Sequence, residues 1–148
     1  MSSRDVATRK ADVLAALERN ADVWLNSASL QGRPHLIAVS GWWDGTDLVI
    51  ATREDSRTGR NLAANRLAAV AAGSPADAVV ITAEVVKSHP VDEEKKTAEG
   101  FAEAVGWDPR EVGEGWMFFR LRPQRINAYR GYDELDGREV MREGRWLG

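Results

Sequence analysis

Residues 52–62, TREDSRTGRNL, gather three arginines, two threonines and one serine, with only two acids among them. The pattern predicts a helix that begins at Arg57, because Ser56 is a preferred N-cap residue and a strand-like run precedes it. Free N–H groups and the dipole at a helix N-terminus favour an anion, and guanidinium groups match phosphate oxygens. The segment is therefore either a phosphate site that uses Arg57 and Arg60, or an ordinary capped helix whose arginines pair with the two acids.

Other patterns of catalytic or metal-binding residues are missing from the sequence. It has no Gly-x-Ser-x-Gly elbow, Walker loop, His-Glu-x-x-His or Gly-x-Gly-x-x-Gly motif, and no cysteine. The two histidines, His35 and His89, lie on different predicted strands without an acidic cluster beside them, so we expect structural roles for both. We predict no catalytic side chain and no metal ligand. If the protein is an enzyme, a cofactor supplies the difficult chemistry.

Length and charge narrow the class of protein further. The 148 residues fit one domain, residues 1–148, and the net charge of −3 argues against general binding of nucleic acid. No apolar run approaches the ~18 residues of a membrane span, and no apolar segment follows the basic residues of the start, MSSRDVATRK. We therefore expect a cytoplasmic protein with neither nucleic-acid nor membrane partners.

The hydrophobic pattern predicts strands with helices at three places. A helix is expected over residues 2–20, with Ser2 and Asp5 resembling a capping box. Strands are expected over residues 22–29, 33–43, 47–52, 67–73, 78–89, 115–123 and 124–131, and further helices over 57–66 and 92–106. Asp44-Gly45 predicts the second hairpin of an antiparallel meander. This pattern is typical of a small antiparallel barrel decorated by helices.

The order of these motifs is similar to a known family. A strand that starts with GRPH, a WWDG hairpin, a strand that ends in AT, and then SRTGRNLAANRLAAV resemble the flavin-binding split β-barrel family of pyridoxamine 5′-phosphate oxidase. The closest resemblance is to the branch of small bacterial proteins that use the deazaflavin coenzyme F-420. It extends from about residue 5 to the end and is strongest over 22–73. It implies a mainly β fold with flanking helices, a split β-barrel, and a homodimer in which both subunits build each cofactor cleft.

The resemblance also implies which residues hold the cofactor. It assigns binding of the cofactor phosphate to Thr52, Ser56, Arg57 and Thr58, with Arg60 as an additional cation. It places the ring system of the cofactor against the strand HLIAVS, where Val39 and Ser40 are the residues expected to contact the ring. Tyr129 stands where relatives place an aromatic residue near the ring of the partner subunit.

The sequence departs from the family at three positions. Thr58 replaces the lysine of the family's Ser-Arg-Lys motif, and Ile37 and Trp42 stand where the oxidases carry an arginine and a lysine that hold the flavin. The substrate-phosphate residues of the oxidases also lack a match, so we do not expect oxidation of pyridoxamine phosphate. Coenzyme F-420 is the expected cofactor, flavin mononucleotide (FMN) the alternative, and haem a remote third.

The resemblance implies an oxidoreductase that transfers a hydride from the reduced deazaflavin to an unsaturated or quinone-like small molecule. The alternative is a non-catalytic protein that binds or carries F-420 or FMN. Adjacent residues of a strand face opposite sides, so one of Trp42 and Trp43 should face the barrel interior and the other should face outward. We expect Trp43 and Trp116 to contribute to the dimer surface.

Overall fold

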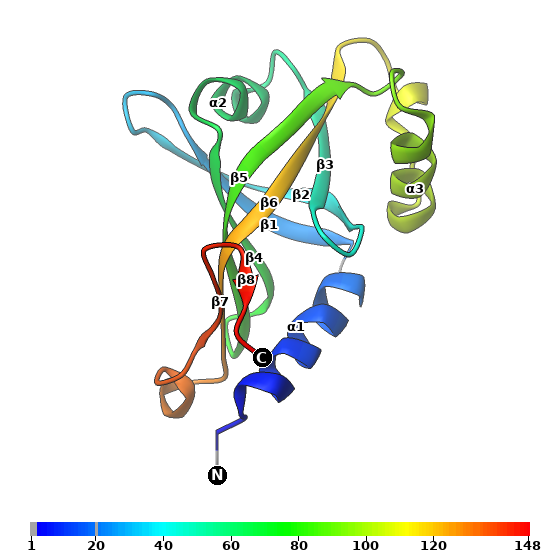
Figure 1. Ribbon diagram of the computed structural model, residues 1–148. Coiled ribbons are helices and arrows are strands. Elements are labelled where there is room, and N and C mark those ends of the chain that lie inside the picture. Colours follow the sequence, from blue (N-terminus) through cyan, green and yellow to red (C-terminus); the bar gives the residue numbers. More distant parts are fainter. Residues whose placement is uncertain (1–2, 20) are drawn as a thin grey trace.

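A computed structural model describes residues 3–19 and 21–148 of the chain (Figure 1). Its elements in chain order are α1 (Val6–Arg19), β1 (Asp22–Ala28), β2 (Pro34–Trp43), β3 (Leu48–Arg53), α2 (Arg57–Asn65), β4 (Leu67–Ser74), β5 (Asp77–Pro90), α3 (Lys95–Val105), η1 (Pro109–Glu111), β6 (Trp116–Tyr129), η2 (Tyr132–Glu134), β7 (Glu139–Arg142) and β8 (Arg145–Trp146). The strand order is β3-β2-β1-β4-β5-β6-β7-β8, and an additional pairing of β3 with β6 closes six antiparallel strands into a barrel. The predicted mainly β split barrel with flanking helices is confirmed.

Helix α1 lies at one end of the barrel, and α2 lies at the other (Figure 1). The first helix begins after Asp5, whose carboxylate accepts the N–H of Thr8 at 2.8 Å and so satisfies one free donor of the first turn. The predicted cap partner Ser2, and Asn20 at the other predicted boundary, lie outside the described residues. Val13 is fully buried against the barrel core, which fixes the inward face of α1.

Alternating side chains fill the barrel interior. Along β1 the buried positions are Val23, Leu25 and Ser27, and their direct partners on β2 are Val39, Ile37 and His35. Directly opposed residues of an antiparallel pair point to the same face, so these β2 side chains also point inward. Val23, Leu25 and Val39 join a core with Ile50, Leu62, Val70, Ile81, Phe119, Leu121 and Ile126, whereas Ile37 is 39% exposed.

A second apolar cluster lies outside the barrel, beneath α3. Phe101 of α3 packs against Phe118 of β6 with ring centroids 5.3 Å apart, and Trp42 and Trp107 pack against the same cluster. Trp43 belongs to the barrel core instead. The prediction that the two adjacent tryptophans face opposite sides is therefore confirmed.

The C-terminal third differs from the predicted boundaries. The two strands expected over 115–123 and 124–131 form one continuous strand, β6. Pro123 lies opposite Ala83, where the register with β5 shifts by one residue, and a bulge is a position at which the missing proline N–H does not interrupt the sheet. The tail, for which no strand was predicted, forms β7 and β8, and Val140 of β7 is fully buried in the core.

Candidate functional site

Helix α2 starts from a tightly built turn after β3. The Ser56 hydroxyl accepts the Gly59 N–H at 3.0 Å and donates to the Arg53 carbonyl at 2.7 Å, and the Thr52 hydroxyl lies 3.0 Å from it. A Cβ on Gly59 would lie 2.3 Å from the Arg53 carbonyl oxygen, so only glycine fits this close approach. Ser56 is thus the predicted N-cap. Its hydroxyl and that of Thr52 hold the turn together.

The arginines of residues 52–62 divide into one that is paired and two that are not. Arg53 Nε lies 3.1 Å from Asp55 Oδ1, and the hydrogen bond from Arg53 is the main reason that the pKa of this carboxyl lies below its ordinary value. Among the described residues, none forms a hydrogen bond or an ion pair with the side chain of Arg57 or Arg60. The interpretation as an ordinary capped helix therefore explains Ser56 and Arg53 and leaves two cations unpaired.

Both unpaired arginines line a pocket between α2 and the loop that joins β1 to β2. This pocket, which we call the arginine pocket, is open and has a volume of about 370 Å³; it is lined by Ser29, Gln31, Arg33, Arg57, Arg60 and Asn61. In Figure 1 the β1–β2 hairpin projects from the barrel next to α2. The lining residues carry three guanidinium groups and no carboxylate, so the pocket suits an anion.

Both walls of the arginine pocket are held in place by hydrogen bonds. The Asn61 side chain donates to Ser27 Oγ at 3.1 Å and the Asn65 side chain donates to the Ala28 carbonyl at 3.2 Å, which fasten α2 to β1. Across the loop, the Arg33 N–H donates to Ser29 Oγ at 3.1 Å. The guanidinium groups therefore project from a backbone that is ordered before a ligand binds, which reduces the entropy that binding must remove.

The structure brings only part of the predicted phosphate set together. Arg57 and Arg60 line the pocket, whereas Thr58 is 3% exposed and faces away from it. Sequence reasoning missed the opposite wall, of which Arg33 is the charged member. Arg33 belongs to LQGR, the loop between β1 and β2, and an arginine in a hairpin loop is the signal that the sequence offers for this wall.

The predicted ring contacts, Val39 and Ser40, point to opposite faces of β2. Val39 packs against the barrel core, while the Ser40 hydroxyl accepts a hydrogen bond of 3.0 Å from the indole N–H of Trp107. Ser40 lies seven residues beyond Arg33, roughly 23 Å along an extended strand. That is longer than the ribityl chain that separates ring and phosphate in a flavin. The exposed β2 residues 36–38 lie closer to the arginine pocket.

Tyr129 lies far from the arginine pocket of its own chain. It ends β6, whereas Trp116 at the start of β6 pairs with Arg53 beside the α2 turn. Thirteen residues of extended strand separate the two ends by roughly 40 Å. Tyr129 could therefore contribute only to the pocket of another subunit, which is the arrangement that the resemblance implied.

The histidines do not line the arginine pocket. His89 is buried beneath α3, where its Nδ1 lies 2.8 Å from the Pro90 carbonyl oxygen and its ring packs against the edge of Phe118. His35 is half-buried on β2. Within residues 3–19 and 21–148, no group of three or more histidine or acidic side chains is arranged to hold a metal ion.

None of the helices in the described part of the chain combines the length and apolar character that a membrane crossing requires.

Known proteins share this architecture. Residues 10–129 match the family model described as pyridoxamine 5′-phosphate oxidase. No curated protein sequence matches the chain significantly.

Among solved structures, an F420 reductase superposes with a TM-score of 0.64 at 19% identity, covering 76% of this chain and 93% of its own. The haem storage protein HutZ of Vibrio cholerae superposes with a TM-score of 0.62 at 14% identity, covering 93% and 99%. A haem-binding protein of Mycobacterium smegmatis gives 0.66 at 21% identity, covering 97% and 60%. These neighbours share the fold at identities too low to transfer a ligand. The family match, which spans most of the barrel, shows that the chain belongs to the pyridoxamine 5′-phosphate oxidase family.

Proposed function

We propose that the protein is an oxidoreductase that uses coenzyme F-420. The observation that carries this proposal is the arginine pocket, in which the guanidinium groups of Arg33, Arg57 and Arg60 form no hydrogen bond or ion pair with the described residues and no acid lines the walls. The bound deazaflavin supplies a hydride to an unsaturated or quinone-like small molecule. The chain's own residues bind and orient it, and solvent protonates the product, which agrees with a pocket that has no lining acid or base.

The shape of the charge distribution favours F-420 over FMN. F-420 carries a phosphodiester followed by a lactyl and glutamate tail, so its negative charges are spread along a chain. The three arginines come from two elements that face each other across an open pocket, and Thr58, in place of the family's lysine, is buried away from it. A compact dianionic monophosphate prefers several donors that converge at one place. FMN is therefore the second candidate.

Haem is the third candidate, and two of the neighbours described above are haem-binding or haem-storage proteins. Haem iron in proteins takes an axial ligand, commonly histidine. His89 is buried beneath α3, and neither histidine lines the arginine pocket. These positions favour a cofactor that is held through phosphate rather than through iron.

We further propose that the protein acts as a homodimer joined through the outer face of the barrel. The exposed apolar side chains of this face include Trp24 on β1 (53% exposed), Leu36 on β2 (63%) and Leu67 on β4 (56%). Trp24 lies directly opposite Ala38 and Ala71 on the two neighbouring strands. Trp43, which the sequence suggested for this surface, is only 8% exposed and belongs to the core. An apolar face of this kind is typical of a subunit interface.

In such a dimer the arginine pocket of one subunit holds the phosphate of the cofactor, and Tyr129 of the partner subunit covers its deazaflavin ring. The exposed β2 residues 36–38, with the backbone of Val39, form the other side of the ring site.

Replacing Trp24 with glutamate is expected to give a monomer. A charge placed in the centre of an apolar interface must be desolvated without a partner, which opposes association. Light scattering at micromolar concentration should give twice the chain mass for the natural protein and the chain mass for Trp24→Glu. Leu147→Glu, at an exposed residue outside this face, should remain dimeric. If the natural protein is a monomer at this concentration, the proposal that two subunits together form each cofactor site is wrong.

The alternative from a different class is a protein that stores or delivers F-420 or FMN without catalysis. The arginine pocket would serve either role, because it anchors only the anionic end. A carrier would shield the ring with protein, whereas an enzyme leaves space for an acceptor beside it.

Titration with three cofactors tests the choice of ligand. We expect the protein to purify colourless from a host that lacks the deazaflavin, and to bind added F-420 more tightly than FMN or haem, as read from tryptophan fluorescence. The affinity for F-420 should decrease when salt is raised from about 0.05 to 0.5 M, because the arginines are exposed and their attraction is screened. A yellow protein that retains flavin through purification reverses the order of the two candidates. A Soret band after haem titration, with F-420 unbound, points to the haem-binding relatives.

A further inference from the structure

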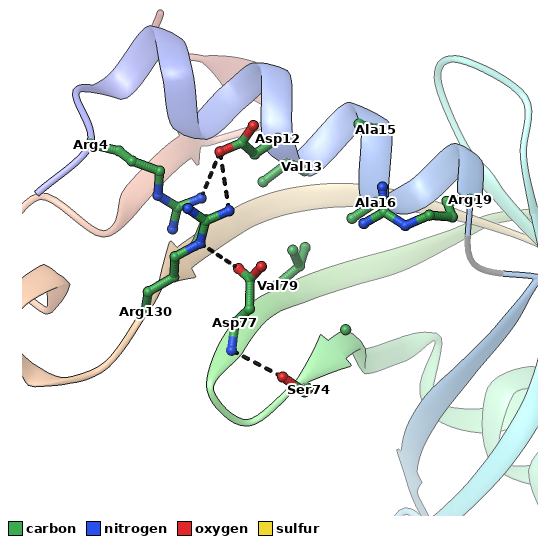
Figure 2. Close-up of a pocket in the computed structure, with 12 residues that line it drawn as sticks. Arg4, Asp12, Val13, Ala15, Ala16, Arg19, Ser74, Asp77, Val79 and Arg130 are labelled. Atoms are coloured by element: carbon green, nitrogen blue, oxygen red, sulfur yellow. Dashed lines mark hydrogen bonds and ion pairs between the residues drawn. The ribbon is translucent and has the colours of Figure 1, made fainter.

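A second pocket lies beneath α1 (Figure 2), and α1 and α2 lie at opposite ends of the barrel (Figure 1). Its volume is about 320 Å³. Three parts of the chain form its walls, namely α1, the turn between β4 and β5, and the end of β6. We call it the α1 pocket. None of its residues belongs to the arginine pocket.

Two of its arginines are fixed by acids. Arg4 Nη1 lies 3.0 Å from Asp12 Oδ2, and the rest of the Arg4 guanidinium is bound by Glu134 beside the pocket. Arg130 Nε lies 3.1 Å from Asp77 Oδ1, and Arg130 Nη2 lies 3.5 Å from Asp12 Oδ2. Arg130 is half-exposed, and its Nη1 has no partner among the described residues, so donors remain available on the pocket side.

The third arginine, Arg19, has no hydrogen bond or ion pair with any described residue. Figure 2 shows its guanidinium group beneath α1, across the pocket from Arg130. With three arginines and two aspartates, the lining residues carry a net charge of +1. Glu134, which binds Arg4 beside the pocket, balances this charge, so Arg19 is the cation left without a partner among the described lining residues.

The floor of the α1 pocket is apolar. It is formed by Val13, Ala16, Val79 and Ala128, each 7% exposed or less. In Figure 2, Val79 lies between the two arginines that face each other. Because these side chains expose little surface, a ligand that reaches the arginines would cover them with only a small part of its aliphatic body.

We propose that the α1 pocket binds a small organic carboxylate with an aliphatic body. The carboxylate accepts hydrogen bonds from Arg19 and from the free donors of Arg130, and the aliphatic body covers Val79 and its apolar neighbours. Arg19 belongs to α1 and Arg130 directly follows β6, so the ligand also connects the helix to the barrel. This site requires neither the cofactor nor the function proposed above, and it stands if that function fails.

Amide-detected NMR titration of the cofactor-free protein with 4-methylpentanoate, acetate and inorganic phosphate tests this site. We expect saturable shifts in the second half of α1 and in residues 73–79. The affinity for 4-methylpentanoate should be about fourfold higher than that for acetate or phosphate, because about one CH₂ group leaves water.

Arg19→Gln should weaken the binding of 4-methylpentanoate at least fivefold, and it leaves the ion pairs of Arg4 and Arg130 intact. Arg57→Gln, at the other end of the barrel, is the matched control and should bind it as the natural protein does. Equal affinity in Arg19→Gln and the natural protein, or shifts confined to the arginine pocket, would overturn the proposal. Phosphate binding as tight as 4-methylpentanoate binding would also overturn it, since the apolar floor would then have no role.

Discussion

Replacing Arg57 with glutamine is expected to raise the dissociation constant for F-420 by roughly tenfold to a hundredfold. The change removes a charge-assisted hydrogen bond to the phosphodiester, which contributes about 1.5–3 kcal/mol. Because Arg57 is exposed and has no partner among the described residues, its loss should change the free energy of unfolding by less than ~0.5 kcal/mol. Fluorescence titration and urea unfolding measure the two effects separately.

The matched control is Arg53→Gln. Arg53 lies in the same segment, yet it pairs with Asp55 and does not line the arginine pocket. Its replacement should change the affinity for F-420 by about twofold or less, because Arg53 does not line the pocket. The exposed ion pair that is lost contributes little to the stability of the turn. If Arg57→Gln binds F-420 as tightly as the natural protein, residues 52–62 are an ordinary capped helix.

A second large effect is expected at Glu134, where glutamine should destabilise the fold by about 3 kcal/mol. The Glu134 carboxylate accepts hydrogen bonds from the Arg4 guanidinium, with a shortest contact of 2.6 Å, and from the backbone N–H groups of Arg4 (2.9 Å) and Arg130 (2.8 Å). The side chains of Arg4 and Glu134 are 10% and 6% exposed. Removing one member of a buried pair costs about 3–5 kcal/mol, and the lower end is expected here because Arg4 keeps its ion pair with Asp12.

This prediction has a pH dependence of known sign. The hydrogen bond from Arg4 is the main cause that lowers the pKa of Glu134 to about 2, from 4.5 in an unfolded chain. A lowered pKa in the folded state means that the stabilisation is complete above about pH 4.5 and is lost as the pH falls toward 2. The difference in unfolding free energy between the natural protein and Glu134→Gln should therefore decrease over that range.

Glu99→Gln provides the control for Glu134. The Lys95–Glu99 pair has an N–O distance of 3.8 Å, and both side chains are exposed. Its loss should change the free energy of unfolding by about 0.5 kcal/mol or less. If urea unfolding at pH 7 shows equal effects for the two substitutions, the Arg4–Glu134 pair does not anchor α1.

The elements that depend on local sequence could be predicted well. The opposite directions of Trp42 and Trp43 follow from their adjacent positions in β2, and Ser56 predicts the start of α2. Asp44-Gly45 correctly marks the β2–β3 hairpin, although the loop has four residues, and the Asp44 carboxylate accepts the N–H groups of Thr46 and Asp47. Such features follow from backbone propensities over a few residues.

Features that depend on distant residues could not be predicted in this way. Arg33 reaches the pocket only because α2 is fastened to β1 by Asn61 and Asn65, contacts between residues more than 30 positions apart. The same applies to Pro123, which stays inside β6 because the pairing with β5 leaves the adjacent Gln124 as a bulge. In both cases the structure depends on a segment that lies far away in the sequence, and a local sequence pattern does not include that segment.

The unpaired state of Arg57 and Arg60 also depends on side-chain geometry. Two acids stand within five residues of Arg57, and pairing with them was an equally simple interpretation of the string. In the structure Asp55 is bound by Arg53, and the helix turns the later arginines toward the β1–β2 loop. Only the fold distinguishes these two arrangements.

The central claim is that the protein is an F-420-dependent oxidoreductase rather than a carrier, and a stopped-flow experiment tests it most directly. Reduced F-420 is mixed with menadione, a quinone, in the presence of the natural protein or of Arg57→Gln, and the return of the visible absorbance of oxidised F-420 is followed. We predict that the natural protein at saturating concentration accelerates this oxidation at least tenfold over the reaction in buffer, and that Arg57→Gln requires a higher concentration for the same rate. Reduced F-420 that binds to the protein but is oxidised no faster than in buffer would contradict the claim and identify a carrier.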